Sequence, residues 1–193
     1  MKILLIYAHP TGESFNHEVR DTFIKSSKKA GHQVDLIDLY EEKFNPVLSE
    51  SELRGELSDE VKAYQERIKK ADYLAFIFPI WWFRMPAIME GWIDRVFTSG
   101  FAFKYIPFIG SFKRPVGLLP VKKAVVISTY GGPGWFYKLF RCSVPWKRLK
   151  LGVLRFCGIK KLVHLPLYYV PFTTDKKRNG YLKKVQRLVC RLK

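Results

Sequence analysis

Near-continuous apolar runs of six to nine residues recur along this chain and are separated by longer amphipathic stretches. Runs such as KILLIYA are typical of parallel strands whose two faces are both covered. The pattern predicts five strands, at residues 2–8, 34–39, 72–78, 123–129 and 161–169. Pro166 cannot donate to a ladder on both sides, so the last strand is expected at an edge of its sheet.

Amphipathic stretches follow these runs and predict the helices. In the last of them Tyr181, Val185 and Leu188 fall on one face at helical spacing. Helices are predicted to begin near residues 14–16, to span 59–70, 86–97 and 145–156, and to begin again near residue 174. The polar stretch 40–58 is expected to be a connection. Residues 99–121 contain many prolines and glycines and are predicted to be a functional loop without regular structure.

Strands that alternate with helices predict an α/β domain with right-handed crossovers. We predict a single domain over residues 1–193, built on a doubly wound five-stranded parallel sheet in the order 2-1-3-4-5. In that order the switch point lies between strands one and three, and ligands bind beyond the carboxyl ends of such strands. The connections at residues 9–16 and 79–84 would then be neighbours, with residues 129–137 beside them.

The three cysteines, Cys142, Cys157 and Cys190, form no CxxC pair and are odd in number. This argues against a disulfide framework and against a zinc site. A reducing compartment fits these cysteines, and we predict a cytoplasmic location. The first aliphatic stretch, residues 3–6, is too short for a secretory signal, and no apolar run approaches the roughly 20 residues that span a bilayer.

The net charge of +17 comes from the second half of the chain. Residues 1–100 hold 13 basic and 16 acidic residues, whereas residues 101–193 hold 21 basic residues and a single acid, Asp175. A solvated basic face is the simplest interpretation, and a field of this sign also attracts anionic lipid, nucleic acid or phosphorylated cofactors. Peripheral contact with an anionic membrane stays open. Nucleic acid is not favoured, because no recognition motif accompanies the charge.

The stretch FPIWWFRMPAIMEGWIDRVF, residues 78–97, joins the end of an apolar strand to a helix through a loop rich in aromatic residues. Pro86 is placed where a helix can begin. Such a loop at the carboxyl end of a strand suits a flat aromatic ligand. The alternative is that Trp81 and Trp82 are core or dimer-interface residues, because aromatic residues dominate those environments too.

The connections after the first and fourth strands add further features. His9, Thr11, Ser14 and Asn16 surround a predicted helix N-terminus, whose free N–H groups and dipole attract phosphate. Simple N-capping by Ser14 or Asn16 is the alternative. The segment TYGGPGWFY, residues 129–137, lets backbone approach a ligand or forms a plain turn. GxGxxG is absent, yet the three connections together describe a flavin site.

These motifs resemble those of the flavodoxin-like NAD(P)H:quinone oxidoreductases, and the resemblance covers nearly the whole chain. It rests on His9 after the first strand, the Ser14-Phe15-Asn16 triplet, the long central motif followed by GFAF, and TYGGPGWFY. The resemblance implies a flavodoxin-like fold, a bound FAD with FMN as the alternative, NAD(P)H as electron donor, and a homodimer.

The resemblance also implies roles for individual residues. The flavin's phosphate and ribityl region would be contacted by His9, Phe15 and Asn16. The isoalloxazine ring would be lined, chiefly by backbone N–H groups, by Ile80, Trp81, Trp82 and Phe83. The opposite wall would be formed by Thr129, Tyr130, Gly131 and Gly132. Tyr137 would reach the ring's carbonyl edge and Arg178 the cofactor's far end, while the substrate-side residues Phe103, Lys104 and Tyr105 would come from the partner across the dimer interface.

Three positions depart from the family's pattern. Ser143 stands six residues after Tyr137, where mammalian quinone reductase carries a histidine. Tyr130 replaces the usual second threonine of its turn, and Arg84 stands where glycine is common. The proton relay and the choice of acceptor are therefore the features in which this chain is expected to differ.

We predict an enzyme, an NAD(P)H dehydrogenase (quinone), that transfers two electrons by a ping-pong route from NAD(P)H through the flavin to a quinone-like acceptor. Flat stacking would supply orientation, and Tyr137 would hydrogen-bond the reduced ring or donate a proton. One alternative is a flavin-bearing regulatory or ancillary subunit of a membrane transporter, such as a potassium-efflux system, which the resemblance admits. A nucleic-acid binder on the same fold is favoured by charge alone.

Overall fold

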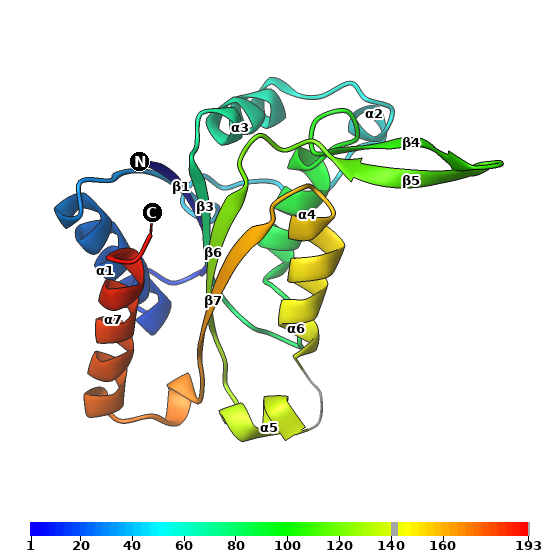
Figure 1. Cartoon of the computed structure of the whole chain (residues 1–193). Helices are drawn as coiled ribbons and strands as arrows, with labels where there is room; N and C mark the ends of the chain where they lie inside the picture. Colours follow the sequence, from blue (N-terminus) through cyan, green and yellow to red (C-terminus); the bar gives the residue numbers. More distant parts are fainter. Residues whose placement is uncertain (140–142, 193) are drawn as a thin grey trace.

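The computed structural model describes residues 1–139 and 143–192, and its strands and helices follow one another as a βα succession (Figure 1). In chain order they are β1 (Lys2–Tyr7), α1 (Phe15–Lys29), β2 (Gln33–Asp38), α2 (Glu50–Leu53), α3 (Asp59–Lys69), β3 (Tyr73–Pro79), α4 (Ala87–Val96), β4 (Phe103–Ile109), β5 (Phe112–Gly117), β6 (Lys123–Thr129), α5 (Gly134–Leu139), α6 (Val144–Lys147), η1 (Arg148–Arg155), β7 (Lys161–Leu167), η2 (Val170–Phe172) and α7 (Asp175–Val189).

The predicted five-stranded sheet is confirmed, with the order β2-β1-β3-β6-β7 and every neighbouring pair parallel. This is the predicted order 2-1-3-4-5 once the two strands outside the sheet are set aside. β7 lies at the edge, where Pro166 pairs in register with Ser128 and needs no N–H for a further neighbour. Strands β1, β3 and β6 are therefore adjacent, and the connections at their carboxyl ends start side by side.

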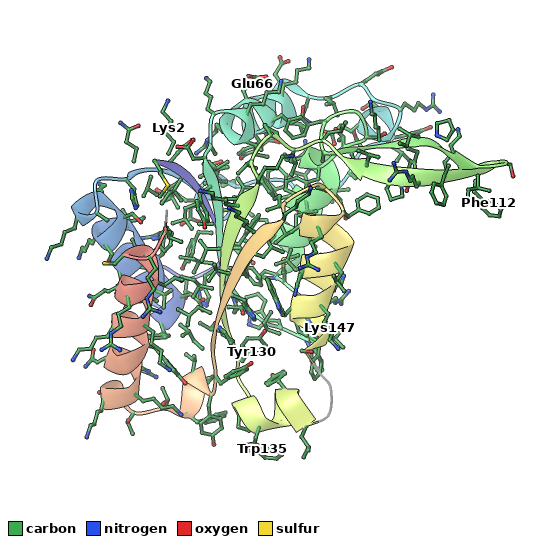
Figure 2. All side chains as sticks on the ribbon, in the orientation of Figure 1. Lys2, Glu66, Phe112, Tyr130, Trp135 and Lys147 are labelled. Atoms are coloured by element: carbon green, nitrogen blue, oxygen red, sulfur yellow. The ribbon has the colours of Figure 1, made fainter. Side chains whose placement is uncertain are left out.

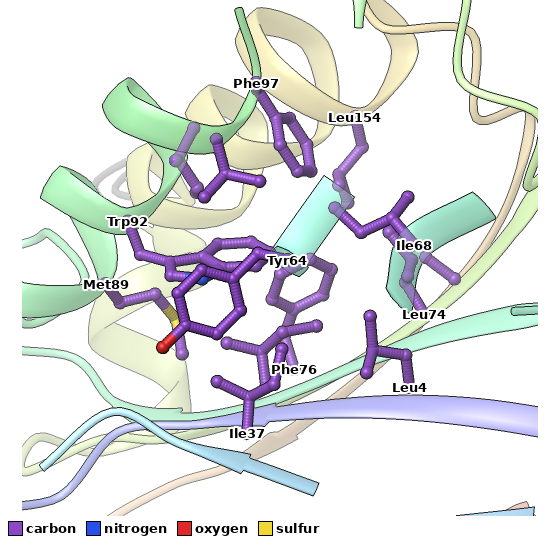
Figure 3. Close-up of a cluster of buried hydrophobic side chains, with 14 of the residues drawn as sticks. Leu4, Ile37, Tyr64, Ile68, Leu74, Phe76, Met89, Trp92, Phe97 and Leu154 are labelled. Atoms are coloured by element: carbon purple, nitrogen blue, oxygen red, sulfur yellow. The ribbon is translucent and has the colours of Figure 1, made fainter. Parts of the chain in front are cut away.

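Two apolar cores lie on opposite faces of the sheet, because successive side chains of a strand point to opposite faces. On one face α1 and α7 pack against Leu5, Ile77 and Ile127. On the other, α3, α4 and η1 surround Trp92, which is fully buried beside Phe76 (Figure 3). Helices thus cover both faces (Figure 1), which explains why the central strands are almost uniformly apolar.

Two predictions of irregular chain are wrong. Residues 99–121, expected to be a loop, contain the antiparallel hairpin of β4 and β5, in which Tyr105 pairs with Pro115. Prolines are compatible with this hairpin because each of its strands has only one neighbour and so one free edge. The connection at residues 40–58 contains the short helix α2, which a capping box of Ser49 and Glu52 stabilises.

The predicted helix at residues 145–156 is confirmed in position but not in type. A short α-helical turn, α6, leads into the π-helical segment η1, and only then does the chain turn at Gly158. The glycine-rich segment after β6 also contains an unpredicted helix, α5. Within the described part of the chain, no helix has the length and apolar character needed to cross a membrane.

A buried arginine holds the connection at residues 40–58 against α4. The guanidinium of Arg95 donates to both carboxylate oxygens of Glu52, at 2.9 and 2.7 Å, and to the carbonyl oxygen of Asn45 at 2.6 Å. Glu60 accepts a further bond at 3.0 Å, and the guanidinium lies over the ring of Phe44. Hydrogen bonding to Arg95 lowers the pKa of Glu52 to about 2. Nothing in the sequence pattern singled out this network.

Gly91 provides a first testable prediction, since α4 approaches Pro46 at this residue. A Cβ at Gly91 would lie 2.2 Å from the Pro46 carbonyl oxygen. We expect Gly91→Ala to lower the free energy of unfolding by about 2 kcal/mol, because overpacking outweighs the gain in helix propensity. The matched control is Gly180→Ala in α7, where a Cβ meets open space, and it should raise stability by about 0.5–1 kcal/mol. Urea unfolding of both variants checks the opposite signs.

Candidate functional site

The three connections that leave β1, β3 and β6 meet at one edge of the sheet, as the sequence predicts. The ring of His9, just after β1, lies 6.1 Å from the ring of Trp81, just after β3. The ring of Phe83 lies 5.8 Å from that of Tyr137 in α5, on the far side of the β6 connection. Each pair joins two different connections, so the turns form one continuous surface.

Thr129, at the end of β6, contacts both the connection after β1 and the connection after β3. Its hydroxyl is 2.9 Å from the side-chain nitrogen and 3.2 Å from the side-chain oxygen of Asn16, and both residues are buried. Its carbonyl oxygen accepts the N–H of Ile80 at 2.8 Å. The cap of α1 is Ser14, whose hydroxyl accepts the His17 N–H at 3.2 Å. Of the two proposed N-caps, Ser14 therefore serves as the cap, while Asn16 braces the site.

The aromatic loop is a tight turn in an unusual backbone conformation. Trp81 and Arg84 exchange two backbone hydrogen bonds, of 3.0 and 2.8 Å. The two residues between them are left-handed, with φ of 49° at Trp82 and 58° at Phe83. Such turns normally carry Asn or Gly at these positions, and left-handed bulky residues store strain that is frequent at functional sites.

The same turn shows that its tryptophans are not core residues. Trp82 is 89% exposed and Trp81 is 41% exposed, so neither indole fills the space between the connections. The alternative that places both tryptophans in the core is wrong, while a role in an interface remains compatible with their exposure. Among the described residues, the N–H groups of Trp82 and Phe83 donate no backbone hydrogen bond and are free to meet a ligand.

Tyrosine rings form a wall behind the β6 connection. Tyr130 packs at 4.7 Å from Tyr137 and 4.9 Å from Tyr168, and Tyr137 stacks on Tyr168 at 5.8 Å. Burial raises the pKa of Tyr130 to about 12, so its phenol stays neutral near pH 7. Tyr168 was not predicted, although its place directly after β7, at the same edge of the sheet, is a signal that could have found it.

The glycines of this connection have separate uses. A Cβ at Gly132 would come within 3.1 Å of the Tyr137 ring, and one at Gly134 within 2.8 Å of the Tyr168 ring, so these two glycines make room for the tyrosines. A Cβ at Gly131 would meet no atom within 4 Å. Gly131, unlike Gly132 and Gly134, therefore faces open space on the exposed side of the turn.

A partly buried histidine lies behind the tyrosine wall. The Nε2 atom of His164 in β7 is 2.8 Å from the Ser128 hydroxyl, and its ring stacks on Trp146 with centroids 4.3 Å apart. Burial lowers the pKa of His164 to about 4, so the ring is neutral near pH 7. Ser128 in turn hydrogen-bonds the Tyr130 side chain. The histidine inside the apolar run KLVHLPLYY was the only sequence signal for this cluster.

His164 makes stability depend on pH. Because its folded pKa of about 4 lies below the ordinary value of 6.5, the unfolded chain binds a proton between these values that the folded chain does not. We expect the free energy of unfolding of the unmodified protein to fall, relative to that of His164→Gln, by about 2–3 kcal/mol as the pH drops through this window. Urea unfolding at several pH values from about 7 to 4 checks this; a constant difference between the two proteins would contradict it.

A polar hollow of about 310 Å³ opens beside the start of α1. Its wall includes His9, Gly12 and Tyr40, and Arg20, which pairs with Asp38 at 3.0 Å. Burial lowers the pKa of His9. The sequence pointed to His9 here but not to Arg20 or Tyr40.

The start of α7 lies at the same edge of the sheet as α5 (Figure 1). Arg178 belongs to the first turns of this helix, and its Nε atom is buried without a hydrogen-bond partner among the described residues. The hydroxyl of nearby Thr173 is also buried without a hydrogen-bond partner among the described residues. Buried polar groups are nearly always paired, so these two atoms are available to a polar ligand at this end of the site.

The predicted substrate-side residues are not brought to these turns within one chain. Phe103, Lys104 and Tyr105 lie on β4, and the hairpin extends from the opposite end of the molecule from α5 (Figure 1). In Figure 2 Tyr130 and Trp135 lie at the lower end and Phe112 at the far tip of the hairpin. Among the described residues no group of three or more potential ligands is placed to hold a metal ion, and Cys142 lies outside them.

A parallel sheet in this order, with ligand-facing turns at the carboxyl ends of its central strands, defines the flavodoxin-like class of α/β proteins. The family described as having a flavodoxin-like fold matches residues 1–189. The chain therefore belongs to this family, and its relatives place it among the NAD(P)H:quinone oxidoreductases.

The relatives are similar over nearly the whole chain. The rat protein named NAD(P)H dehydrogenase [quinone] 1 is 30% identical, with 96% of this chain and 76% of the rat protein covered. The rat ribosyldihydronicotinamide dehydrogenase [quinone] is 31% identical, with 97% of this chain and 90% of the relative covered. The solved structure of the NAD(P)H:quinone oxidoreductase from Methanothermobacter marburgensis has a TM-score of 0.90 at 30% identity and covers 100% of this chain and 99% of its own.

Proposed function

We propose that this protein is a flavin-dependent NAD(P)H dehydrogenase (quinone), which transfers two electrons from NAD(P)H to a quinone-like acceptor. The observation that supports this most is the convergence of the three connections, joined by the His9–Trp81 and Phe83–Tyr137 ring contacts and by the Asn16–Thr129 hydrogen bonds. The names of the rat and archaeal relatives describe the same reaction.

The donor groups at the site fit a flavin. A flat ring with carbonyl and nitrogen acceptors at its edge needs backbone N–H groups, and the left-handed turn presents those of Trp82 and Phe83. A polar tail at the other end would satisfy the buried Nε of Arg178 and the hydroxyl of Thr173. A bound flavin supplies two-electron redox chemistry, so that NAD(P)H and the acceptor can use one site in turn.

Each connection has a distinct part in this proposal. Trp82 and Phe83 hold the ring edge through their N–H groups, whereas the N–H groups of Ile80 and Trp81, also predicted to line the ring, donate instead to the carbonyl oxygens of Thr129 and Arg84. Thr129 to Gly132 form the opposite wall, with Gly131 leaving space for close approach. At the N-terminus of α1, the phosphate and ribityl region of the flavin is held by His9, Phe15 and Asn16. Because Asn16 is committed to Thr129, its main effect is to fix the wall rather than to bind the cofactor freely.

Tyr137 is the catalytic residue in this proposal, because its hydroxyl can exchange a hydrogen bond or proton with the carbonyl edge of the ring. We expect Tyr137→Phe to lower kcat by about 100-fold or more, since a positioned proton donor contributes roughly 10²–10⁴-fold. The phenyl ring preserves the packing against Phe83 and Tyr130, so flavin content should stay unchanged. Steady-state kinetics and the absorption spectrum check this, and unaltered kcat would remove Tyr137 from the mechanism.

Several finer features belong to the same proposal. FAD is the expected cofactor, with FMN as the alternative. Phe103, Lys104 and Tyr105 reach the substrate only from a second copy of the chain, because the hairpin extends from the opposite end of the molecule (Figure 1), so a homodimer is proposed.

The cytoplasmic location stays a prediction from the cysteine content. The alternative role as a transporter subunit gains no support from the fold, the site or the relatives named above.

The freshly purified protein tests the proposal. We expect a yellow protein with a flavin absorption spectrum, whose released chromophore is identified by mass, and which oxidises NADH or NADPH only when a quinone is present. Dihydronicotinamide riboside should be assayed in parallel, because one relative is named for that donor. Protein that remains colourless after incubation with FAD and with FMN, and that oxidises none of the three donors, would overturn the proposal.

A further inference from the structure

Three hydrogen-bonded side chains lead from β7 to the tyrosine wall. The Nε2 atom of His164 lies 2.8 Å from the hydroxyl of Ser128, and Ser128 hydrogen-bonds the side chain of Tyr130. Ser128 is 1% and Tyr130 4% exposed, while His164 is partly buried. Hydrogen bonds shielded from water are stronger than exposed ones, and each partner fixes the orientation of the next. We call these three residues the polar triplet.

The pairing of two parallel strands explains why the triplet forms. His164 of β7 is in register with Val126 of β6, and Ser128 lies two residues further along β6. Side chains two residues apart in a strand share a face, so Ser128 and His164 project from the same face of the sheet. The ring of Trp146 in α6 stacks on the imidazole at 4.3 Å, with 18° between the planes. One hydrogen bond and one stacking contact therefore hold the imidazole in place.

The triplet ends at a ring that supports Tyr137. The ring of Tyr130 meets that of Tyr137 edge-on at 4.7 Å, and Tyr168 stacks on Tyr137 at 5.8 Å, with 25° between the planes. Tyr137 belongs to α5, a helix of six residues that lies below the ends of β6 and β7, apart from the helices that cover the sheet (Figure 1). Helices this short are unstable by themselves. The position of Tyr137 is therefore set by the rings that touch it.

We propose that the polar triplet positions Tyr137 in the candidate site, with His164 as the residue that fixes the orientation of the other two. The inference rests on the proposed function, which makes Tyr137 the proton donor. A donor acts only within hydrogen-bond distance of the atom that it serves, and small displacements of catalytic groups lower rates steeply. Loss of the triplet should therefore slow the chemical step while the cofactor stays bound.

Tyr130 is less suited to donate the proton itself. Its side chain is almost fully buried and is engaged by Ser128, whereas Tyr137 is only partly buried. Burial also raises the pKa of Tyr130 to about 12, which makes its phenol a weaker acid. A purely structural role is the other alternative, since a buried polar network also stabilises the edge of the sheet. The structural and positioning roles predict different results once Tyr137 has no hydroxyl.

The first experiment measures kcat of the flavin-loaded protein, with benzoquinone as acceptor, in variants that break the triplet. Ser128→Ala and His164→Leu should each lower kcat by about tenfold, a part of the roughly 100-fold loss that a 1 Å displacement of a reacting group causes. Flavin content and KM for NAD(P)H should stay unchanged. His164→Gln should retain most of the activity, because its side-chain amide can still hydrogen-bond Ser128.

The second comparison repeats the substitution in the Tyr137→Phe background. If the triplet acts through the Tyr137 hydroxyl, adding Ser128→Ala to Tyr137→Phe should cause little further loss of kcat, because residues that act as a unit are strongly non-additive. A purely structural role predicts the same fractional loss in both backgrounds. Equal losses would therefore overturn the proposal.

A spectroscopic measurement tests the positioning without any turnover. The full-length protein is labelled with 3-fluorotyrosine, and the fluorine NMR resonance of Tyr137 is assigned by its absence from Tyr137→Phe. This resonance should shift or broaden in Ser128→Ala and His164→Leu, because the neighbouring ring is no longer held, and should keep its place in His164→Gln. If the unmodified protein reduces no quinone, the proposed function fails, and this spectrum alone decides whether the triplet positions Tyr137.

Two control variants lie away from the site. Val189→Ala removes a fully buried side chain at the end of α7 and lowers stability without touching the triplet. His32→Leu replaces another partly buried histidine, which precedes β2 at the amino end of the sheet. Both controls should keep the kcat and the Tyr137 resonance of the unmodified protein. A tenfold loss of kcat in Val189→Ala would show that stability is being measured, and would overturn the proposal.

Two further results would also count against the positioning role. One is an unchanged Tyr137 resonance in both Ser128→Ala and His164→Leu, which would show that the triplet does not hold the ring. The other is an unchanged kcat in both variants of an enzyme that reduces benzoquinone, which would show that the orientation held by the triplet does not affect the reaction.

Discussion

Arg95→Met is expected to lower the free energy of unfolding by about 3–5 kcal/mol, the largest effect on stability of any substitution considered for this chain. The variant leaves the Glu52 carboxylate buried and without the two bonds, of 2.9 and 2.7 Å, that Arg95 donates. It also removes the donor to the Asn45 carbonyl oxygen, so the connection between β2 and α3 loses its attachment to α4. Urea unfolding followed by circular dichroism measures the loss.

Two further variants show that the effect comes from an unpaired buried charge. Adding Glu52→Gln to Arg95→Met removes the stranded carboxylate, so the double variant should be more stable than Arg95→Met alone. Arg54→Met breaks a pair in which both side chains are largely exposed, and should cost less than about 1 kcal/mol. A double variant that is less stable than Arg95→Met would contradict this account.

The pH dependence gives an independent check of the same network. Arg95 holds the folded pKa of Glu52 at about 2, below the ordinary value of 4.5, so the stability from this pair is present above pH 4.5 and is lost as the pH falls towards 2. In Arg95→Met the buried carboxylate is destabilising until it is protonated. The stability difference between the two proteins should therefore shrink as the pH falls through this range.

Phe83→Pro is expected to weaken flavin binding by at least about 100-fold while the fold is retained. Proline fixes φ near −65°, whereas Phe83 has φ of 58°, so the turn that carries Trp82 and Phe83 cannot form as it is. Proline also removes an N–H group that the proposed site offers to the cofactor, and a lost hydrogen bond to a bound group costs about 1–3 kcal/mol. Titration with FAD, followed by fluorescence quenching, measures the affinity.

Phe83→Gly is the matched control, because glycine adopts the left-handed conformation without strain and keeps the N–H group. It loses only the ring that packs at 5.8 Å from Tyr137, so its affinity should fall by about tenfold or less. Circular dichroism and thermal unfolding should show both variants folded, since the turn is exposed and lies outside both cores. Equal flavin affinity of the proline and glycine variants would show that the backbone of this turn does not hold the ring.

The main strands and the place of the candidate site followed from local pattern. Apolar runs such as residues 73–79 are typical of strands covered on both faces, and five of them alternating with helices leave few topologies. Once that order is accepted, the connections after the first, third and fourth runs have to meet, because parallel strands end at the same edge. This reasoning predicted that His9, Asn16, Ile80 to Phe83 and Thr129 to Tyr137 lie near one another, and contacts between the three connections confirm it.

The errors arose where context outweighs local propensity. The prolines and glycines of residues 99–121 predict a loop without regular structure, yet a hairpin with two free edges accepts Pro107 and Pro115. The helix at residues 145–156 has helical apolar spacing, but η1 is π-helical, and no apolar pattern of that length distinguishes the two. Capping by Ser14 rather than Asn16 was left open because both residues suit an N-cap equally well.

The sequence by itself determined the class of fold, the order of the sheet and the meeting of three connections at the candidate site, because these depend on the period of apolar residues and on the geometry of parallel strands. Only the tertiary structure decided the partners of polar groups: Arg95 with Glu52, Ser128 with His164, and Asn16 with Thr129. Each of these pairs joins residues far apart in the chain. Their contacts depend on how elements pack together, and no local periodicity encodes that packing.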